Sequence, residues 1–176
     1  TPSVDPERVL ATVLFTDLVD STATAAELGD RRWRSLLERF ERLSCAELDG
    51  FGGEMVKSTG DGLLATFDGP ARAIRCARSM AESVEPLGVR IRAGIHTGEI
   101  ERRGSDVAGI AVHIASRVEG MAEPGEVATT GTVSDLVVGS GLTFRDLGAK
   151  ELKGVPGEWR IAVVAGDGEE PAAPAI

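Results

Sequence analysis

The sequence predicts an α+β fold, a ferredoxin-like split βαβ sandwich in which helices pack on one face of a mainly antiparallel sheet. Two observations lead to this prediction. Short apolar runs alternate with amphipathic stretches in the order β-α-β-β-α-β, with smaller elements behind them. The 176 residues also hold no internal repeat and no second block of comparable size. We therefore expect one domain over residues 1–165 and a disordered, Pro-, Ala- and acid-rich tail over residues 166–176.

The first strand is predicted from Val9 to Leu18, where apolar residues crowd together. Asp20, Ser21 and Thr22 follow at once and are typical caps for the start of a helix. An amphipathic helix is then predicted from residue 30 to about residue 48, because apolar residues recur every three or four positions, at Trp33, Leu36, Leu37, Phe40 and Leu43.

A β-hairpin follows the glycines at positions 52 and 53. Its strands are predicted at Glu54–Ser58 and Gly62–Phe67, around the turn Thr59-Gly60-Asp61. The next helix is predicted from Pro70, a residue favoured in a first helical turn, to Val84.

The second half begins with an alternating strand at Val89–Gly98. The polar stretch Glu99–Val107 is predicted to be a loop, and Gly109–Met121 has the apolar spacing of a third helix. The remaining elements are short, with strands at Glu126–Thr129, Leu142–Phe144 and Glu158–Val164 and a one- to two-turn helix near residues 133–137.

The composition limits the partners. With 28 acidic and 19 basic side chains, a net charge of −9, the chain is not expected to bind nucleic acid. No apolar run approaches the ~20 residues of a membrane span, so no membrane contact by this segment is expected. Cys45 and Cys76 fall in helical patterns and are interpreted as free, buried thiols in a reducing, cytoplasmic compartment.

Two aspartates occupy similar settings. Asp17 closes the run Val13–Leu18, and Asp61 lies in Lys57–Gly62, each where an apolar strand must turn. Two carboxylates on neighbouring strand ends suit a pair of divalent ions roughly 3.5–4 Å apart, which can activate an oxygen nucleophile and stabilise a leaving phosphate. This pair predicts an enzyme.

More polar residues accompany the pair. Lys57 precedes Asp61 on the hairpin, although a single lysine there is more often a solvated strand residue. His113 and Arg117 lie four residues apart and project from one face of the third predicted helix, and Asp106 lies in the stretch leading into that helix.

Four separated motifs together resemble the catalytic domain of class III nucleotidyl cyclases of the bacterial homodimeric type, over about Val9 to Val164. They are Phe15-x-Asp-Leu-x-Asp-Ser-Thr22, Lys57-Ser-Thr-Gly-Asp-Gly62, Gly94-Ile-His-Thr-Gly98 and Asp106-Val-Ala-Gly-x-x-Val-His-x-Ala-Ser-Arg117.

The resemblance implies an adenylyl cyclase that converts ATP to 3′,5′-cyclic AMP and pyrophosphate. Asp17, Asp61 and the Leu18 carbonyl would bind two Mg²⁺ or Mn²⁺ ions per site. The residues opening the first helix would receive phosphate oxygens on backbone amides, at Val19, Asp20, Ser21 and Thr22.

The resemblance also assigns the base and phosphate contacts. Lys57 and Asp106 match the base-selecting pair, whose donor and acceptor complement adenine and not guanine. Arg117 matches the arginine that stabilises the charged α-phosphate. Lys153 matches a lysine that contacts the triphosphate, although its neighbour Lys150 is an alternative.

The resemblance further implies a homodimer with shared sites. One chain would supply Asp17 and Asp61, and the other would supply Lys57, Asp106, His113 and Arg117. The family usually has asparagine at the position of His113, where it orients the ribose, so the role of this histidine is open. His96 is interpreted as a structural residue.

Three alternative functions share part of this pattern. A diguanylate cyclase shares the metal chemistry, but Gly52-Gly-Glu-Met55 lies before the strand of Lys57 and lacks the aromatic ending of that family's signature. A polymerase-like palm needs a nucleic-acid channel, which the acidic composition disfavours. A catalytically silent nucleotide-binding or dimerisation module is favoured only by His113.

Overall fold

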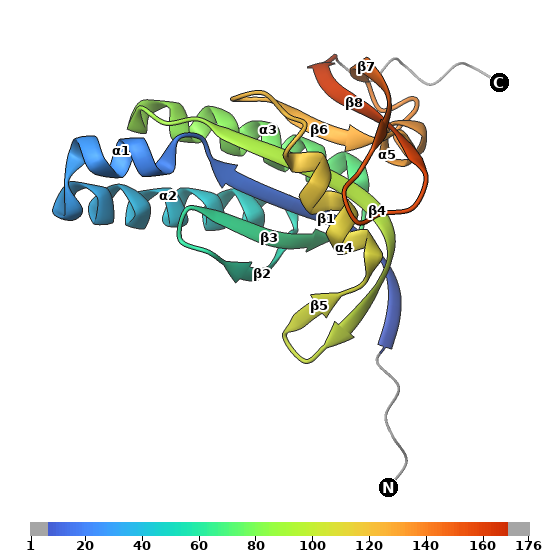
Figure 1. Ribbon diagram of the computed structural model, residues 1–176, viewed down its shortest axis with the longest axis horizontal. Helices are drawn as coiled ribbons and strands as arrows, with labels where there is room; N and C mark the ends of the chain where they lie inside the picture. The colour runs from blue at the N-terminus through green and yellow to red at the C-terminus, as the bar shows by residue number, and fades with distance from the viewer. Residues whose placement is uncertain (1–6, 169–176) are drawn as a thin grey trace, which may run out of the picture.

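The computed structural model describes residues 7–168. The chain forms, in order, β1 (Glu7–Leu18), α1 (Ser21–Leu28), α2 (Asp30–Phe51), β2 (Glu54–Ser58), β3 (Gly62–Phe67), α3 (Pro70–Val84), a 3₁₀ turn (Glu85–Leu87), β4 (Ile91–Arg103), β5 (Asp106–Ala108), α4 (Ile110–Glu119), β6 (Val127–Thr130), α5 (Gly131–Leu136), β7 (Leu142–Glu151) and β8 (Glu158–Asp167). These elements confirm the α+β class (Figure 1).

All strands belong to one sheet with the order β2-β3-β1-β4-β6-β8-β7, and β5 extends it by pairing with β4. Among the strand pairs within residues 7–168, only β4–β6 is parallel, so the sheet is mainly antiparallel as predicted. β1 lies between β3 and β4, and its residues Val13 and Leu14 are fully buried. The apolar run at the start of the chain therefore forms the middle of the sheet.

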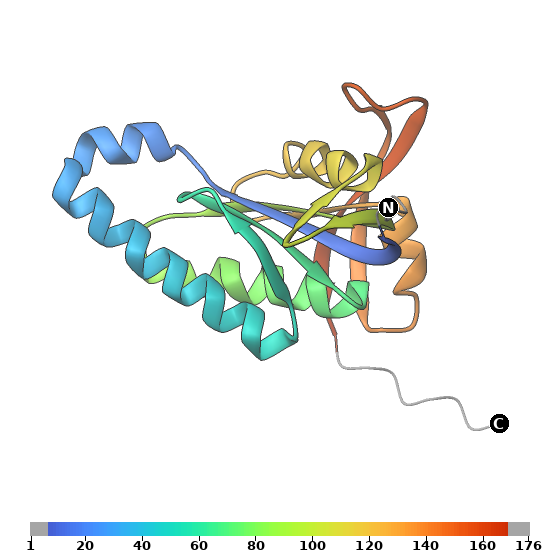
Figure 2. The same cartoon turned by 90° about the horizontal axis from the view of Figure 1, so that it is seen from below.

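The sheet is covered on both faces. Figure 2 shows α2 and α3 on one side and α4 on the other. The first face packs Phe40 and Ile74 against Leu14, and the second packs Ala111 and Ala115 against Val13. The expectation that helices cover one face is therefore wrong for α4, because alternating residues of β1 are apolar on both sides.

The polar stretch after Gly98 is also not a loop. β4 continues to Arg103 and pairs with β5 through a turn at Gly104, whose φ of 62° suits glycine. The start of β1 pairs with this hairpin, from Glu7 opposite Arg102 to Leu10 opposite Glu99. Ile100 and Val107 of the hairpin are buried, but the residues around them are polar, so the stretch lacks the apolar alternation on which the prediction relied (Figure 1).

The C-terminal strands are longer than predicted. β7 reaches Glu151, and β8 reaches Asp167, which pairs with Leu142 and accepts a hydrogen bond from the Arg75 Nε at 3.0 Å. Residues 166 and 167 therefore belong to the sheet and not to a disordered tail. The rest of the predicted tail, from residue 169, lies outside the described residues.

Two expectations from composition can be compared with the structure. Cys76 is buried and Cys45 is half-buried, and both are free thiols. Burial raises the pKa of the Cys76 thiol to about 12, which keeps it protonated. Over residues 7–168, no helix combines the length and apolar character required to cross a bilayer.

Candidate active site

The two aspartates meet where the end of β1 lies beside the start of β3. Asp17 is opposite Gly62 in the antiparallel register, and the Leu18 amide donates to the Asp61 carbonyl at 2.8 Å. A Cβ at position 62 would lie 2.2 Å from the Thr16 carbonyl oxygen, so only glycine permits this approach. The glycine after Asp61 thus brings the two carboxylates together, as the sequence predicted.

A hollow of about 290 Å³ opens beside this pair. Its lining combines Asp17 and Asp61 with residues from β2 and α4, namely Lys57, Ser116 and Glu119. We call Asp17, Asp61 and Glu119 the carboxylate corner. Sequence reasoning missed Glu119. The available signal was its position two residues after Arg117, one turn from Ser116 on α4.

The carboxylate corner carries excess negative charge. Partial burial, and then the neighbouring Asp61 charge, raise the pKa of Asp17, whereas the Leu18 amide and Arg92 oppose the rise. Burial, followed by the Asp17 charge, raises the pKa of Glu119 to about 7. Repulsion between like charges in a partly shielded hollow is relieved by a bound cation or by a proton.

The residues at this corner suit divalent cations. Carboxylate and carbonyl oxygens are the ligands that Mg²⁺ and Mn²⁺ prefer. Residues 7–168 contain no group of three or more His, Cys, Asp or Glu side chains arranged around a metal position. Mg²⁺ usually takes one or two carboxylates and completes its shell with water and substrate phosphates.

The start of α1 borders the same corner. Ser21 and Thr22 line a hollow of about 390 Å³ together with Thr59, Gly60 and Asp61. The first-turn amides of a helix have no intrahelical acceptor and can receive an anion. Two expectations fail here. Asp20 adopts a left-handed backbone, φ 54°, and makes no capping bond.

The second failure concerns Val19, whose amide donates to the Arg90 carbonyl at 2.9 Å. This bond extends the pairing beyond the ends of β1 and β4, so the Val19 amide is already satisfied in the sheet. The Val19 amide is therefore excluded from the predicted phosphate-binding segment, and Asp20, Ser21 and Thr22 remain as predicted.

Lys57 and Asp106, 49 residues apart, lie side by side. The Lys57 Nζ is 3.3 Å from the Asp106 Oδ1, and both side chains are about half exposed. The Val107 amide donates to the same carboxylate at 2.8 Å. That amide, and then Lys57, lower the pKa of Asp106. Asp106 lies in β5 and not in a loop, and pairing with β4 fixes its position.

His113, Arg117 and Lys153 form a third group, which we call the α4–loop cluster. The His113 Nε2 and the Arg117 Nε lie 2.9 Å and 3.2 Å from the Lys153 carbonyl oxygen. Lys153 follows β7 in the loop that leads to β8, beside α4 (Figure 1). Its neighbour Lys150 is inside β7, paired with Trp159 of β8. The structure brings Lys153, and not Lys150, to Arg117.

His96 is a core residue, as interpreted from the sequence. It is 5% exposed, its Nδ1 lies 2.8 Å from the Thr130 hydroxyl, and its ring meets Trp159 edge-on with centroids 5.5 Å apart. Burial lowers the pKa of His96 to about 4. It is therefore neutral near pH 7 and does not face the hollow of Asp17.

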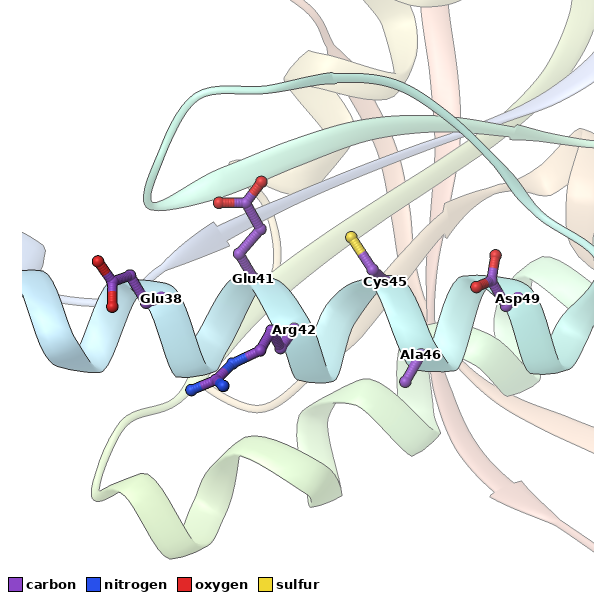
Figure 3. Close-up of a pocket in the computed structure, with 6 residues that line it drawn as sticks. All are labelled: Glu38, Glu41, Arg42, Cys45, Ala46 and Asp49. Carbon is purple, nitrogen blue, oxygen red and sulfur yellow. The ribbon is translucent and has the colours of Figure 1, made fainter.

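A larger hollow of about 660 Å³ lies along α2. Figure 3 shows its six lining residues on this one helix, with Glu41, Cys45 and Asp49 pointing to one side and Arg42 and Ala46 to the other. Because the lining comes from one helix and points to two sides of it, these groups do not converge on a common point. The smaller hollow, which gathers residues from several elements, is therefore the candidate site.

Comparison with known proteins agrees with this geometry. The model of the adenylate and guanylate cyclase catalytic domain matches residues 6–165. The chain therefore belongs to this family and is a nucleotide cyclase catalytic domain.

An adenylate cyclase from Glutamicibacter nicotianae is 32% identical over 127 residues, which are 70% of this chain and 31% of that protein. The chain spans less than a third of the length of the curated relatives it matches first.

Solved structures of both substrate types share the fold. The adenylyl cyclase CyaB from P. aeruginosa has a TM-score of 0.85 at 22% identity, covering 96% of this chain and 100% of that one. The guanylyl cyclase Cya2 has a TM-score of 0.84 at 23% identity, covering 94% and 96%. The shared fold therefore leaves the choice of nucleotide to the residues of the site.

Proposed function

We propose that the chain is an adenylyl cyclase that converts ATP to 3′,5′-cyclic AMP and pyrophosphate. One observation carries the choice of ATP, the contact between Lys57 and Asp106 across β2 and β5. Adenine offers an acceptor at N1 and a donor at its 6-amino group, which match an ammonium and a carboxylate held side by side. Guanine reverses both groups and would leave them unpaired.

Asp17 and Asp61, with the Leu18 carbonyl, would hold two Mg²⁺ or Mn²⁺ ions. When bound, such ions lower the pKa of the ribose 3′-hydroxyl and neutralise the triphosphate and the departing pyrophosphate. The chain supplies the fixed geometry, because the glycine at position 62 and the Leu18–Asp61 hydrogen bond keep the strand ends in contact. The raised pKa of Asp17, which reflects burial and the nearby Asp61 charge, also supports a cation at this corner.

Residues at the start of α1, on α4 and in the β7–β8 loop would bind the phosphate groups of the nucleotide. Ser21 and Thr22 present first-turn amides beside Asp61. The Arg117 Nε donates to the Lys153 carbonyl oxygen, so the two terminal amino groups of the guanidinium can bind an α-phosphate. Lys153 is exposed and is the proposed triphosphate contact.

The site is proposed to form between two copies of the chain. The hollow beside Asp17 and Asp61 is not lined by His113, Arg117 or Lys153 within residues 7–168. A two-fold homodimer would bring the α4–loop cluster of one copy to the carboxylate corner of the other, giving two equivalent sites. In this arrangement the monomer is inactive.

A silent nucleotide-binding module is the second candidate, and one observation favours it. His113 replaces the usual asparagine and is bonded to the Lys153 carbonyl, so its ring is already occupied in the free chain. The silent module predicts nucleotide binding without turnover.

The deciding experiment is cyclic nucleotide formation by the purified chain with ATP or GTP and Mn²⁺ or Mg²⁺. Asp17→Ala is the control that removes a metal ligand. Cyclic AMP from ATP that disappears in the control supports the proposal, and cyclic GMP from GTP in preference to ATP refutes the substrate assignment. If a confirmed dimer forms no product but binds ATP, the silent module is correct.

A further inference from the structure

The α4–loop cluster contains a contact that the cyclase reaction itself does not require. Because a carbonyl oxygen can only accept, the His113 Nε2 must carry a proton and donate it to the Lys153 oxygen at 2.9 Å. The Arg117 Nε donates to the same oxygen at 3.2 Å. Two donors one helical turn apart therefore hold a single backbone group of the β7–β8 loop.

The surrounding loop is built around this contact. Leu152 and Val155 are buried in the core beneath α4, and the Val155 amide closes a turn onto the Leu152 carbonyl at 3.0 Å. Gly154, at the exposed corner, has a φ of +80°, and a Cβ there would lie 2.8 Å from the His113 Nε2. The glycine is what allows the imidazole ring to lie against the turn.

We infer that His113 is a positioning residue that clamps the turn of residues 152–155 onto α4 and thereby fixes Lys153 and the Arg117 side chain. The inference rests on the proposed function for its catalytic consequence, but the clamp itself belongs to the free chain. The His113 ring spans the gap to the loop, and in the free chain its Nε2 bonds the protein backbone.

The clamp is tested first without substrate, by amide hydrogen exchange. The reporter is the Val155 amide, and the internal control is Gly88, whose amide closes a similar turn onto Glu85 at 2.9 Å far from α4. His113→Leu is expected to speed exchange at Val155 roughly three- to tenfold and to leave Gly88 unchanged. His113→Gln, which keeps a donor at similar reach, should restore protection. Unchanged exchange at Val155 in His113→Leu overturns the clamp.

A pair of glycine variants tests the contact from the loop side. Gly154→Ala and Gly157→Ala carry the same backbone strain, at φ +80° and +81°, but a Cβ at 157 meets nothing within 4 Å. Gly154→Ala should therefore deprotect Val155 more than Gly157→Ala does. That excess should vanish when His113 is also changed to alanine, because the two residues act through one contact. An excess that persists without the ring contradicts the inference.

Kinetics then separates a clamp from a ribose contact. A clamp predicts that His113→Leu lowers turnover of ATP and 2′-deoxy-ATP by the same factor, and that its effect is not additive with Lys153→Ala. A changed ratio between the two nucleotides assigns His113 to the ribose and overturns the clamp. If the unmodified chain makes no cyclic nucleotide, the proposed function fails, and the exchange experiment still decides the clamp.

Discussion

The carboxylate corner and the α4–loop cluster differ in how their charges are balanced. At the corner, burial destabilises the anions of Asp17 and Glu119, and so does a neighbouring negative charge, that of Asp61 on Asp17 and that of Asp17 on Glu119. In the α4–loop cluster, Arg117 and His113 already donate to a fixed carbonyl. The first region holds like charges that repel each other, whereas the second is preorganised in the free chain.

This difference indicates which side chains in each region can be replaced without loss of its role. If the corner binds metal ions as proposed, it depends on carboxylate identity, because its binding free energy comes from the attraction between the carboxylates and the cations. The α4–loop cluster depends on geometry, so another donor of suitable length can replace the usual asparagine. His113 is such a replacement, and it is accommodated by the missing side chain at Gly154.

The largest expected effect tests whether the two regions work in different subunits. Asp17→Ala and Arg117→Ala should each reduce cyclic AMP formation by about a thousandfold or more. Mixed in equal amounts, half of the dimers are hybrids with one competent site of two, so activity should return to about a quarter of the original.

The matched control for this mixing is Asp17→Ala with Asp61→Ala. Both changes lie in the same region, so every dimer lacks a complete carboxylate corner and activity should stay absent. Recovery in this control, or none in the first mixture although hybrids are shown to form, contradicts the shared site.

The second effect concerns the core beneath the α4–loop cluster. His96 has a pKa of about 4 in the fold, below its ordinary 6.5. Below pH 6.5 the unfolded chain therefore binds a proton that the folded chain does not, and the free energy of unfolding should fall by about 3 kcal/mol as the pH drops from 6.5 to 4. Above pH 6.5 this contribution is constant.

Urea denaturation of the unmodified chain and of His96→Gln across this pH range provides the measurement. Other groups titrate in both proteins, so the difference between the two curves isolates His96. A difference that does not change with pH would show that His96 is not buried as a neutral ring against Thr130 and Trp159.

The third effect concerns the ion pair between Lys57 and Asp106. Lys57→Glu removes the donor and places two carboxylates together, so ATP turnover should fall roughly 10- to 100-fold while use of GTP rises relative to ATP. Arg34→Glu, an exposed residue of α2, makes the same change in net charge away from the site. Unchanged selectivity in Lys57→Glu removes this pair from the base pocket.

The sequence predicted best the elements with strong periodicity and clear breakers. Pro70–Val84 is a helix with the bounds predicted, because proline opens it and apolar spacing continues throughout. The β4–β5 hairpin was missed, since its exposed residues carry no alternation. Among site residues, the two motif aspartates lie close together as expected, because Asp17 is near the end of β1 and Asp61 directly precedes its partner strand β3.

What the sequence could not give is contact between distant elements. Glu119 joins the carboxylate corner because the packing of α4 brings it to the hollow beside Asp17, and its position one turn from Ser116 indicates only which face of α4 it shares. The bond from His113 to Lys153 likewise depends on where the β7–β8 loop docks. These features follow from packing and not from local pattern.

The smallest effect tests whether the carboxylate corner is under electrostatic strain. The pKa of Asp17 is raised above 3.8, partly by Asp61, so the folded chain loses stability as the pH rises through the range in which Asp17 ionises. Asp61→Asn removes that repulsion and should stabilise the metal-free protein by about 0.5–1 kcal/mol at neutral pH.

Thermal unfolding in EDTA and in excess Mn²⁺ measures this. In EDTA the unmodified chain should have a lower melting temperature than Asp61→Asn. Excess Mn²⁺ should raise the melting temperature of the unmodified chain more, because an ion that binds only the folded state stabilises it by mass action. Asp68→Asn, which neutralises an exposed carboxylate after the other end of β3, is the control and should change neither value. Equal melting of the unmodified chain and Asp61→Asn in EDTA would mean that the corner stores no repulsion, and the contrast with the α4–loop cluster would then be one of geometry alone.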